Sequence, residues 1–286
     1  MAKVMVVTDS TANISPELLS GNPIRVLPLQ LIWDHKILRD GIDISPVEFY
    51  TKLVKADVMP TTSQTTPEEF KLAYAELIDK GYDILSIHIS SKLSGTLDSA
   101  TQAKHDFPKA HIELVDSLST SMAMGFQVMA AARAAANGSS LKECVAIAEK
   151  AKTQTGVFFA VNTLEYLKRG GRIGGAAAFL GTALKLKPIL ELRDGQIEAV
   201  ERVRTLSKTL DRLLDLVELK LGSEPGPVRL CAVHGNSPIE AEELLDKAVK
   251  RFSSTLVSEA LIADISPVIG THTGPGALGL AWMNGM

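Results

Sequence analysis

Apolar residues in the first half of the chain occur in short continuous runs that alternate with helical stretches. Three such runs cover residues 4–8, 84–89 and 112–115. Strands of a parallel sheet are buried on both faces, so they read as continuous apolar stretches. The pattern therefore predicts an α/β fold that begins with a parallel sheet.

The helices between these runs carry clear start signals. Ser45 and Thr66 are each followed by a proline and, three residues on, by a glutamate. A capping hydroxyl, a proline in the first turn and an acid at the third position together stabilise a helix start. Helices are therefore expected from residue 45, over 66–80 with a stop at Gly81, over about 119–136, and from a further capping box at 140–143.

The pattern changes after about residue 155. A strand at 157–161 is followed by a glycine-rich basic segment at 167–175 and an apolar helix at about 176–186. An Asp194-Gly195 pair between alternating runs then predicts a β-hairpin, and so antiparallel pairing. The remaining expected elements are a helix from about 205, a strand at 228–233, a helix capped by Ser237 and a final strand before 271.

These patterns predict two domains. We place an N-terminal parallel-sheet α/β domain at residues 1–155 and a C-terminal α+β domain at residues 156–286. No repeat, low-complexity tract or long linker separates them. The two domains are therefore expected to share a tight interface and a cleft.

Composition and charge exclude several classes of protein. The 30 basic and 33 acidic residues give a net charge of −3, and no stretch concentrates Lys and Arg as a nucleic-acid surface would. Cys144 and Cys231 are too few for a disulfide framework or a four-ligand zinc site, and the histidines lack metal-ligand spacing. No segment approaches the about 20 apolar residues of a membrane span. We expect a cytoplasmic protein without a metal, a cofactor or a nucleic-acid partner.

Hydroxyl-rich segments follow two of the predicted strands. Residues 8–11, Thr-Asp-Ser-Thr, lie at the carboxyl end of the first strand, where open α/β sheets bind ligands. A turn that closes the strand explains this segment equally well, so both interpretations stay open. Residues 90–96 follow a buried strand and open a helix, and they match neither a P-loop nor the nucleophile elbow of hydrolases.

A third segment, residues 60–66, holds five hydroxyls before a helix start. Capping needs only Thr66, which leaves Thr61, Thr62 and Ser63 unexplained. A helix N-terminus with added hydroxyl donors is a natural anion receptor. If this segment and residues 90–96 converge, they would form a cradle for a carboxylate or a phosphate.

His272 lies in the glycine-rich segment 270–276, which we expect to be a turn after a strand. Such a turn can bring its backbone close to a ligand, so this histidine is a stronger candidate than the other five. Arg172 belongs to the basic segment 169–172. That segment is explained by anion contact or by a solvated turn.

Together these segments resemble the DegV family. The shared motifs are Thr-Asp-Ser-Thr, Thr-Ser-Gln, Ser-Ser-x-Leu-Ser-Gly-Thr, Gly-Gly-Arg-Ile, Val-Arg-Thr and His-Thr-Gly-Pro-Gly, in order from residue 8 to residue 276. The resemblance implies a non-catalytic lipid-binding protein that holds one long-chain fatty acid, such as palmitate, stearate or oleate, in a tunnel between two domains.

The resemblance also implies roles for particular residues. The carboxylate would bind Thr62 and Ser94, and the neighbouring residues assigned to the same site are Thr61, Ser63, Gly95 and Thr96. Arg172, Arg204 and His272 would lie near the head group or dock a partner. That partner would be the separate ATP-binding subunit of a bacterial fatty-acid kinase, which makes acyl phosphate.

Burial of a C16 or C18 tail at ~0.8 kcal/mol per methylene amounts to roughly 10 kcal/mol before the costs of ordering and association. The apolar helix at 176–186 could line the tunnel or belong to the core. A rival interpretation is a hydrolase or phosphotransferase that uses Ser94 or His272, with His272 and Asp9 as possible partners of a nucleophile. A third interpretation is a small-molecule sensor or an unliganded scaffold.

Overall fold

The first sheet is parallel and four-stranded, in the order β2-β1-β6-β7. In this computed structural model, which describes residues 3–181, 186–253 and 255–286, all three predicted runs are strands of the sheet. β2 was missed because it is a short edge strand with only one fully buried residue. The strands are β1 (Lys3–Asp9), β2 (Ile24–Leu27), β6 (Tyr82–His88) and β7 (Ile112–Asp116).

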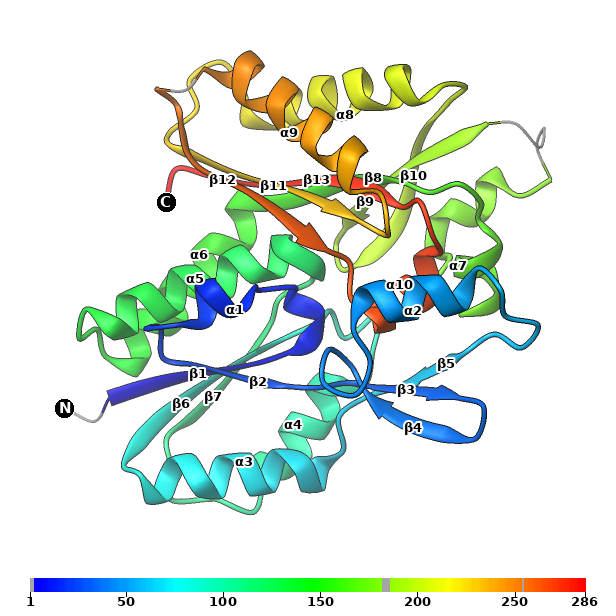
Figure 1. Cartoon of the computed structure of the whole chain (residues 1–286). Coiled ribbons are helices and arrows are strands. Elements are labelled where there is room, and N and C mark those ends of the chain that lie inside the picture. The colour runs from blue at the N-terminus through cyan, green and yellow to red at the C-terminus, as the bar shows by residue number, and fades with distance from the viewer. Residues whose placement is uncertain (1–2, 182–185, 254) are drawn as a thin grey trace.

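The helices around this sheet begin where the capping signals lie. Ser45, Thr66 and Ser140 each form the complete capping box. Figure 1 shows α3 and α4 on one side of the sheet and α5 and α6 on the other, between it and the second sheet. These elements are α1 (Pro16–Leu19), α2 (Pro46–Leu53), α3 (Pro67–Asp79), α4 (Thr96–Lys104), α5 (Ser121–Ala136) and α6 (Leu141–Gln154).

The second sheet is mixed and six-stranded, in the order β10-β9-β8-β13-β11-β12. The predicted hairpin is confirmed, since β9 and β10 pair antiparallel across Asp194-Gly195. Helices α8 (Leu206–Leu221) and α9 (Pro238–Phe252) cover its outer face (Figure 1). The strands are β8 (Thr155–Ala160), β9 (Lys187–Arg193), β10 (Gln196–Val203), β11 (Val228–His234), β12 (Val257–Asp264) and β13 (Leu278–Asn284). The fold class is therefore confirmed: a parallel-sheet α/β unit joined to a mixed α+β unit.

The expected final strand is β12, but another strand follows it. β13 lies at the centre of the sheet, between β8 and β11, and is antiparallel to both. Almost all of its residues are buried. It was missed because it comes directly after a glycine-rich segment that looked like a terminal turn.

A third, small sheet has the order β4-β3-β5. It consists of β3 (Gln30–Trp33), β4 (Lys36–Arg39) and β5 (Thr61–Ser63), and α2 and α10 (Pro267–Thr273) lie beside it. Residues 60–66 were expected to form a loop into a helix. That expectation is wrong for Thr61–Ser63, because these residues pair with β3, about 30 positions earlier in the chain.

Two further expectations about local structure are wrong. The segment at 176–186 is not one long helix: the 3₁₀ helix η2 (Gly174–Phe179) ends near Leu180, and β9 begins at Lys187. Leu180 is extended and Gly181 has a positive φ, which ends the helical stretch there. Residues 182–185 lie outside the described part of the chain. His272 lies in helix α10 and not in a turn, since Ser266 and Pro267 start that helix and Gly274 ends it.

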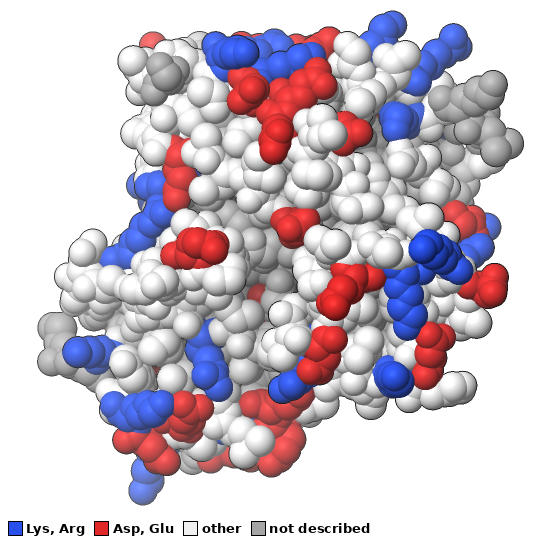
Figure 2. Space-filling model, in the orientation of Figure 1, with Lys and Arg blue, Asp and Glu red and all other residues white. Residues whose placement is uncertain are grey.

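The remaining expectations concern a membrane span, the distribution of surface charge and the domain boundary. Within the described residues, no helix is long and apolar enough to cross a membrane. Figure 2 shows acidic and basic side chains interspersed over the described part of one face. The first strand of the second sheet begins at Thr155, and the division into domains 1–155 and 156–286 remains a prediction.

Candidate functional site

A cavity of about 210 Å³ lies between the two larger sheets. Most of its lining is aliphatic or aromatic. Strands of the second sheet contribute to it, and Ile89 lies directly after β6 of the first sheet. Val157 and Phe159 are two positions apart on β8, so both face the same side of the strand. Other apolar lining residues are Ile89, Leu192, Ile197 and Val233. A wall of this kind suits a long hydrocarbon chain.

Polar side chains also line this cavity. Thr62 Oγ1, from strand β5, lies 2.9 Å from Nε2 of His272, from helix α10. Ser63 lines the cavity from the same strand, and Ser94 lines it from the loop before α4. The lining therefore includes hydroxyl groups from two separate segments of the chain.

Ser94 is held by its own loop. Its Oγ lies 2.9 Å from Thr96 Oγ1, and it also accepts a hydrogen bond of 3.3 Å from the Thr96 backbone N–H. Thr96 is the first residue of α4, a nine-residue helix whose N-cap, Gly95, makes no side-chain cap. Ser94 therefore stands beside a helix N-terminus, as the sequence predicted.

Arg172 spans two loops at the cavity wall. Its Nε donates to the Leu93 carbonyl at 3.0 Å, and its Nη1 donates to the Gly170 carbonyl at 2.6 Å. Among the described lining residues it is the one Lys, Arg, Asp or Glu. The guanidinium is a fixed positive charge beside the loop that carries Ser94, and such a charge favours an anionic ligand group.

His272 is neutral in this setting. Burial, with a smaller contribution from the Arg172 charge, lowers the pKa of its imidazole to about 4. Nδ1 is buried and has no hydrogen-bond partner among the described residues. A Cβ atom at position 170 would lie 1.9 Å from that nitrogen, so Gly170 leaves the space that the ring occupies.

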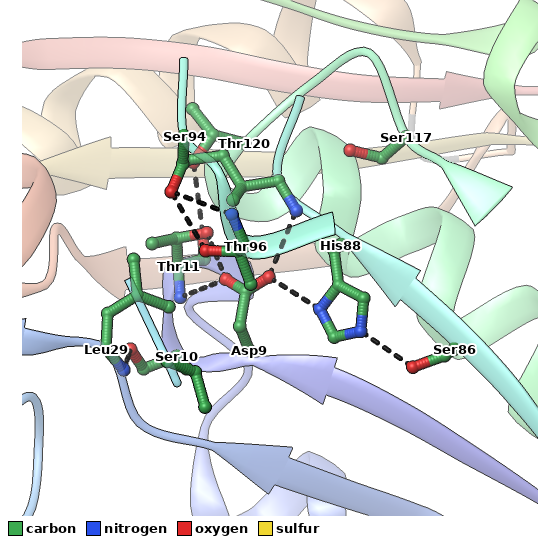
Figure 3. A network of polar contacts seen from close by, with 12 residues as sticks. Asp9, Ser10, Thr11, Leu29, Ser86, His88, Ser94, Thr96, Ser117 and Thr120 are labelled. Carbon is green, nitrogen blue, oxygen red and sulfur yellow. Dashed lines mark hydrogen bonds and ion pairs between the residues drawn. The ribbon is translucent and has the colours of Figure 1, made fainter. Parts of the chain in front are cut away.

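The Thr-Asp-Ser-Thr segment turns out to be structural. Asp9 is fully buried, caps the 3₁₀ helix η1 (Ser10–Ala12) and accepts from the Thr11 N–H. It also accepts from the Ile89 N–H at 3.0 Å, and His88 Nδ1 lies 3.0 Å from it. Figure 3 shows Asp9 at the centre of these contacts. The carboxylate thereby fixes the start of the loop that leads to Ser94.

The geometry contradicts the hydrolase arrangement. A nucleophilic serine needs a histidine beside it and an acid that orients the histidine. Ser94 instead bonds Thr96, His272 bonds Thr62, and Asp9 contacts His88. In the described residues the predicted series from Ser94 through His272 to Asp9 is not assembled.

The predicted site residues fall into two groups. Thr62, Ser63, Ser94, Arg172 and His272 line the cavity, and the structure brings them together from four segments of the chain. The others lie outside its lining. Thr61 is exposed on β5, Gly95 and Thr96 lie behind Ser94 at the start of α4, and Arg204 is exposed just after β10.

Several polar lining residues were not predicted: Gln64, Thr120, Ser121 and Thr273. Gln64 stands within the Thr-Ser-Gln motif, so the motif itself was the signal that could have identified it. Ser121 has a positive φ, and its buried hydroxyl has no partner among the described residues. No pattern in the sequence indicates that Thr120 and Ser121 face a cavity.

Comparison with known proteins places the whole chain in one family. Residues 3–285 match the family described as "Uncharacterised protein, DegV family". A DegV domain-containing protein of Streptomyces coelicolor is 38% identical over 278 residues, which is 97% of each chain.

Solved structures agree with this match. A DegV family protein from Thermus thermophilus, described for its fatty acid binding, is 36% identical with a TM-score of 0.92, over 99% of both chains. DegV from Bacillus subtilis, described as a fatty acid binding protein, is 34% identical with a TM-score of 0.88, over 99% of this chain and 100% of that one. The chain therefore belongs to the DegV family.

Proposed function

We propose that this chain binds one long-chain fatty acid, such as palmitate, stearate or oleate, in the cavity between its two larger sheets. The acyl tail lies against the apolar wall. The carboxylate lies on the polar side, where Thr62 and Ser94 donate hydrogen bonds to it. The observation that carries the proposal is one largely apolar cavity whose lining includes two hydroxyls from distant segments, Thr62 and Ser94, with a buried histidine and an arginine.

The energetics of the two ends of the ligand support this proposal. Burial of a C16 or C18 tail contributes roughly 10 kcal/mol before the costs of ordering and association. A carboxylate removed from water needs several donors to offset its desolvation. Thr62, Ser63 and Ser94 offer hydroxyls, and Arg172 adds a positive charge nearby.

The fatty acid binding of the relatives from Thermus thermophilus and Bacillus subtilis supports the same ligand class for this chain. Both are similar to it over nearly its full length. We assign the ligand to this cavity because the cavity lining combines apolar side chains with hydroxyl groups.

We further propose that the chain carries its ligand to another protein and does not transform it. The partner is a separate ATP-binding subunit of a fatty-acid kinase, which phosphorylates the carboxylate to form acyl phosphate. Among the described residues no histidine is hydrogen-bonded to Ser94, which argues against this serine as a nucleophile. Arg204 is exposed and does not line the cavity, so it is available for docking.

Mass spectrometry of an organic extract tests the ligand. Protein purified from cells should release about one long-chain fatty acid per chain. An extract without fatty acid, from protein that also fails to take up added palmitate, would refute the proposal. ATP turnover by the isolated chain, or its covalent labelling by a fluorophosphonate, would favour an enzyme over a carrier.

A further inference from the structure

Gln64 connects the two hydroxyl segments of the candidate site. It directly follows strand β5, which carries Thr62. Both residues line the cavity. The Gln64 side chain amide reaches the other segment: Nε2 donates to the Gly95 carbonyl at 3.0 Å and to Ser99 Oγ at 2.8 Å.

The same contact explains why residue 95 is a glycine. Gly95 has φ of −79°, a conformation open to any residue, so its backbone does not require glycine. Space does. A Cβ atom at position 95 would lie 2.3 Å from Gln64 Oε1 and 2.9 Å from both Cδ and Nε2. The amide of Gln64 thus packs directly on the Gly95 backbone.

This contact lies next to Thr62 and Ser94, the two residues proposed to bind the carboxylate. Gly95 is the neighbour of Ser94, and Ser99 is one turn further into helix α4. The two hydrogen bonds therefore fix β5 against the N-terminal turn of α4. Two hydroxyls on separate segments can share one carboxylate only if the distance between the segments is held constant.

We propose that Gln64 is a positioning residue that sets the spacing between the Thr62 and Ser94 hydroxyls, and that Gly95 is the surface against which it is set. This inference rests on the proposed function, since it assigns Gln64 to the binding of a carboxylate head group. Gln64 acts through the two hydroxyls and not as their replacement.

The test compares a ligand with a carboxylate and a ligand without one. Palmitate and 1-hexadecanol compete with fluorescent cis-parinaric acid for the delipidated protein. In Gln64→Ala, misplaced hydroxyls should weaken palmitate binding about tenfold, because two hydrogen bonds hold the spacing and tenfold corresponds to ~1.4 kcal/mol. Binding of 1-hexadecanol should change less than twofold. An equal loss for both ligands would overturn the inference, since it would indicate general damage to the cavity.

A double-variant cycle tests the pairing with Gly95. Gly95→Ala alone should weaken palmitate binding about as much as Gln64→Ala, because the new methyl group displaces the amide. In the Gln64→Ala background it should add less than twofold, because the clashing atoms are gone. Additive losses would overturn the pairing.

Gln64→Met provides a second route if Gln64→Ala does not fold. Methionine keeps the length of the side chain and removes its amide donors, so the same loss of selectivity for palmitate is expected. Unchanged selectivity in a folded Gln64→Met protein would refute the role of the amide. Failure of the wild-type protein to bind either palmitate or parinaric acid would instead refute the proposed function itself.

Discussion

Thr62 and His272 are 210 positions apart in the chain, and their side chains meet at 2.9 Å. Strand β5 brings one to the cavity wall and helix α10 brings the other. Burial keeps the imidazole neutral by lowering its pKa to about 4. The polar side of the cavity therefore depends on the packing of an early strand against a late helix.

Removal of either proposed carboxylate donor should weaken fatty acid binding. Thr62→Val and Ser94→Ala should each lower the affinity for palmitate roughly tenfold or more, because a hydrogen bond to a charged group contributes about 1.5–3 kcal/mol. Displacement of a fluorescent fatty acid measures this. Thr62→Ser keeps the hydroxyl, and Thr61→Val alters the exposed neighbour on the same strand, so both should bind like the wild type. Equal losses in Thr61→Val and Thr62→Val would contradict the assignment.

Gly170→Ala should disturb His272 specifically. The added methyl group would lie 1.9 Å from Nδ1, so the ring must shift from the position in which it contacts Thr62. Overpacking of this kind costs about 1–3 kcal/mol of unfolding free energy. Urea unfolding measures it. The same substitution in a His272→Ala background should be nearly neutral, and a full loss there would show that the glycine serves some other contact.

Asp40 should give the protein a distinctive dependence of stability on pH. Its carboxylate is buried, accepts from Ser10 Oγ at 2.6 Å and from the Val268 N–H at 3.2 Å, and so joins η1 to the start of α10. Burial is the main cause that raises the pKa of Asp40 from 3.8 to about 6. Between these two values the unfolded chain ionises Asp40 while the folded protein keeps it protonated.

The contribution of Asp40 to stability is therefore fully present below pH about 4 and is lost as pH rises to about 6. Asp40→Asn should gain stability relative to the wild type by about 3 kcal/mol across this interval and stay level above it. Urea unfolding of both proteins at a series of pH values checks this, because every other titrating group is common to both. A difference that does not vary with pH would show that Asp40 titrates normally.

Arg204→Ala should separate carriage of the ligand from its delivery. The side chain is exposed and does not line the cavity, so the affinity for palmitate should not change. If Arg204 docks the kinase subunit, the rate of acyl phosphate formation with that subunit and ATP should fall about tenfold or more. Arg193→Ala, at the far end of the preceding hairpin, serves as a charge-matched control. Loss of palmitate binding in Arg204→Ala would contradict this division.

Local patterns were sufficient for the elements whose partners are close in sequence. The capping boxes at Ser45, Thr66 and Ser140 and the hairpin at Asp194-Gly195 all formed as expected. Ser266-Pro267 carries a similar start signal for α10, but the surrounding glycines favoured a turn. Each of these signals acts within a few residues, which is why the sequence reveals it.

Elements that depend on distant partners could not be predicted in this way. Strand β5 is short and rich in hydroxyls, and it becomes a strand only by pairing with β3. The motif containing Thr62, Ser63 and Gln64 suggested a ligand site. Its geometry, with Thr62 against His272 and Gln64 against Gly95, follows from packing between segments that no local pattern encodes.

The most direct test of the account is a crystal structure of the protein with stearate bound. We predict an acyl chain between the two larger sheets, against Val157 and Phe159, with its carboxylate within hydrogen-bonding distance of Thr62 Oγ1 and Ser94 Oγ. A carboxylate that lies away from both hydroxyls, or a chain bound outside this cavity, would contradict it.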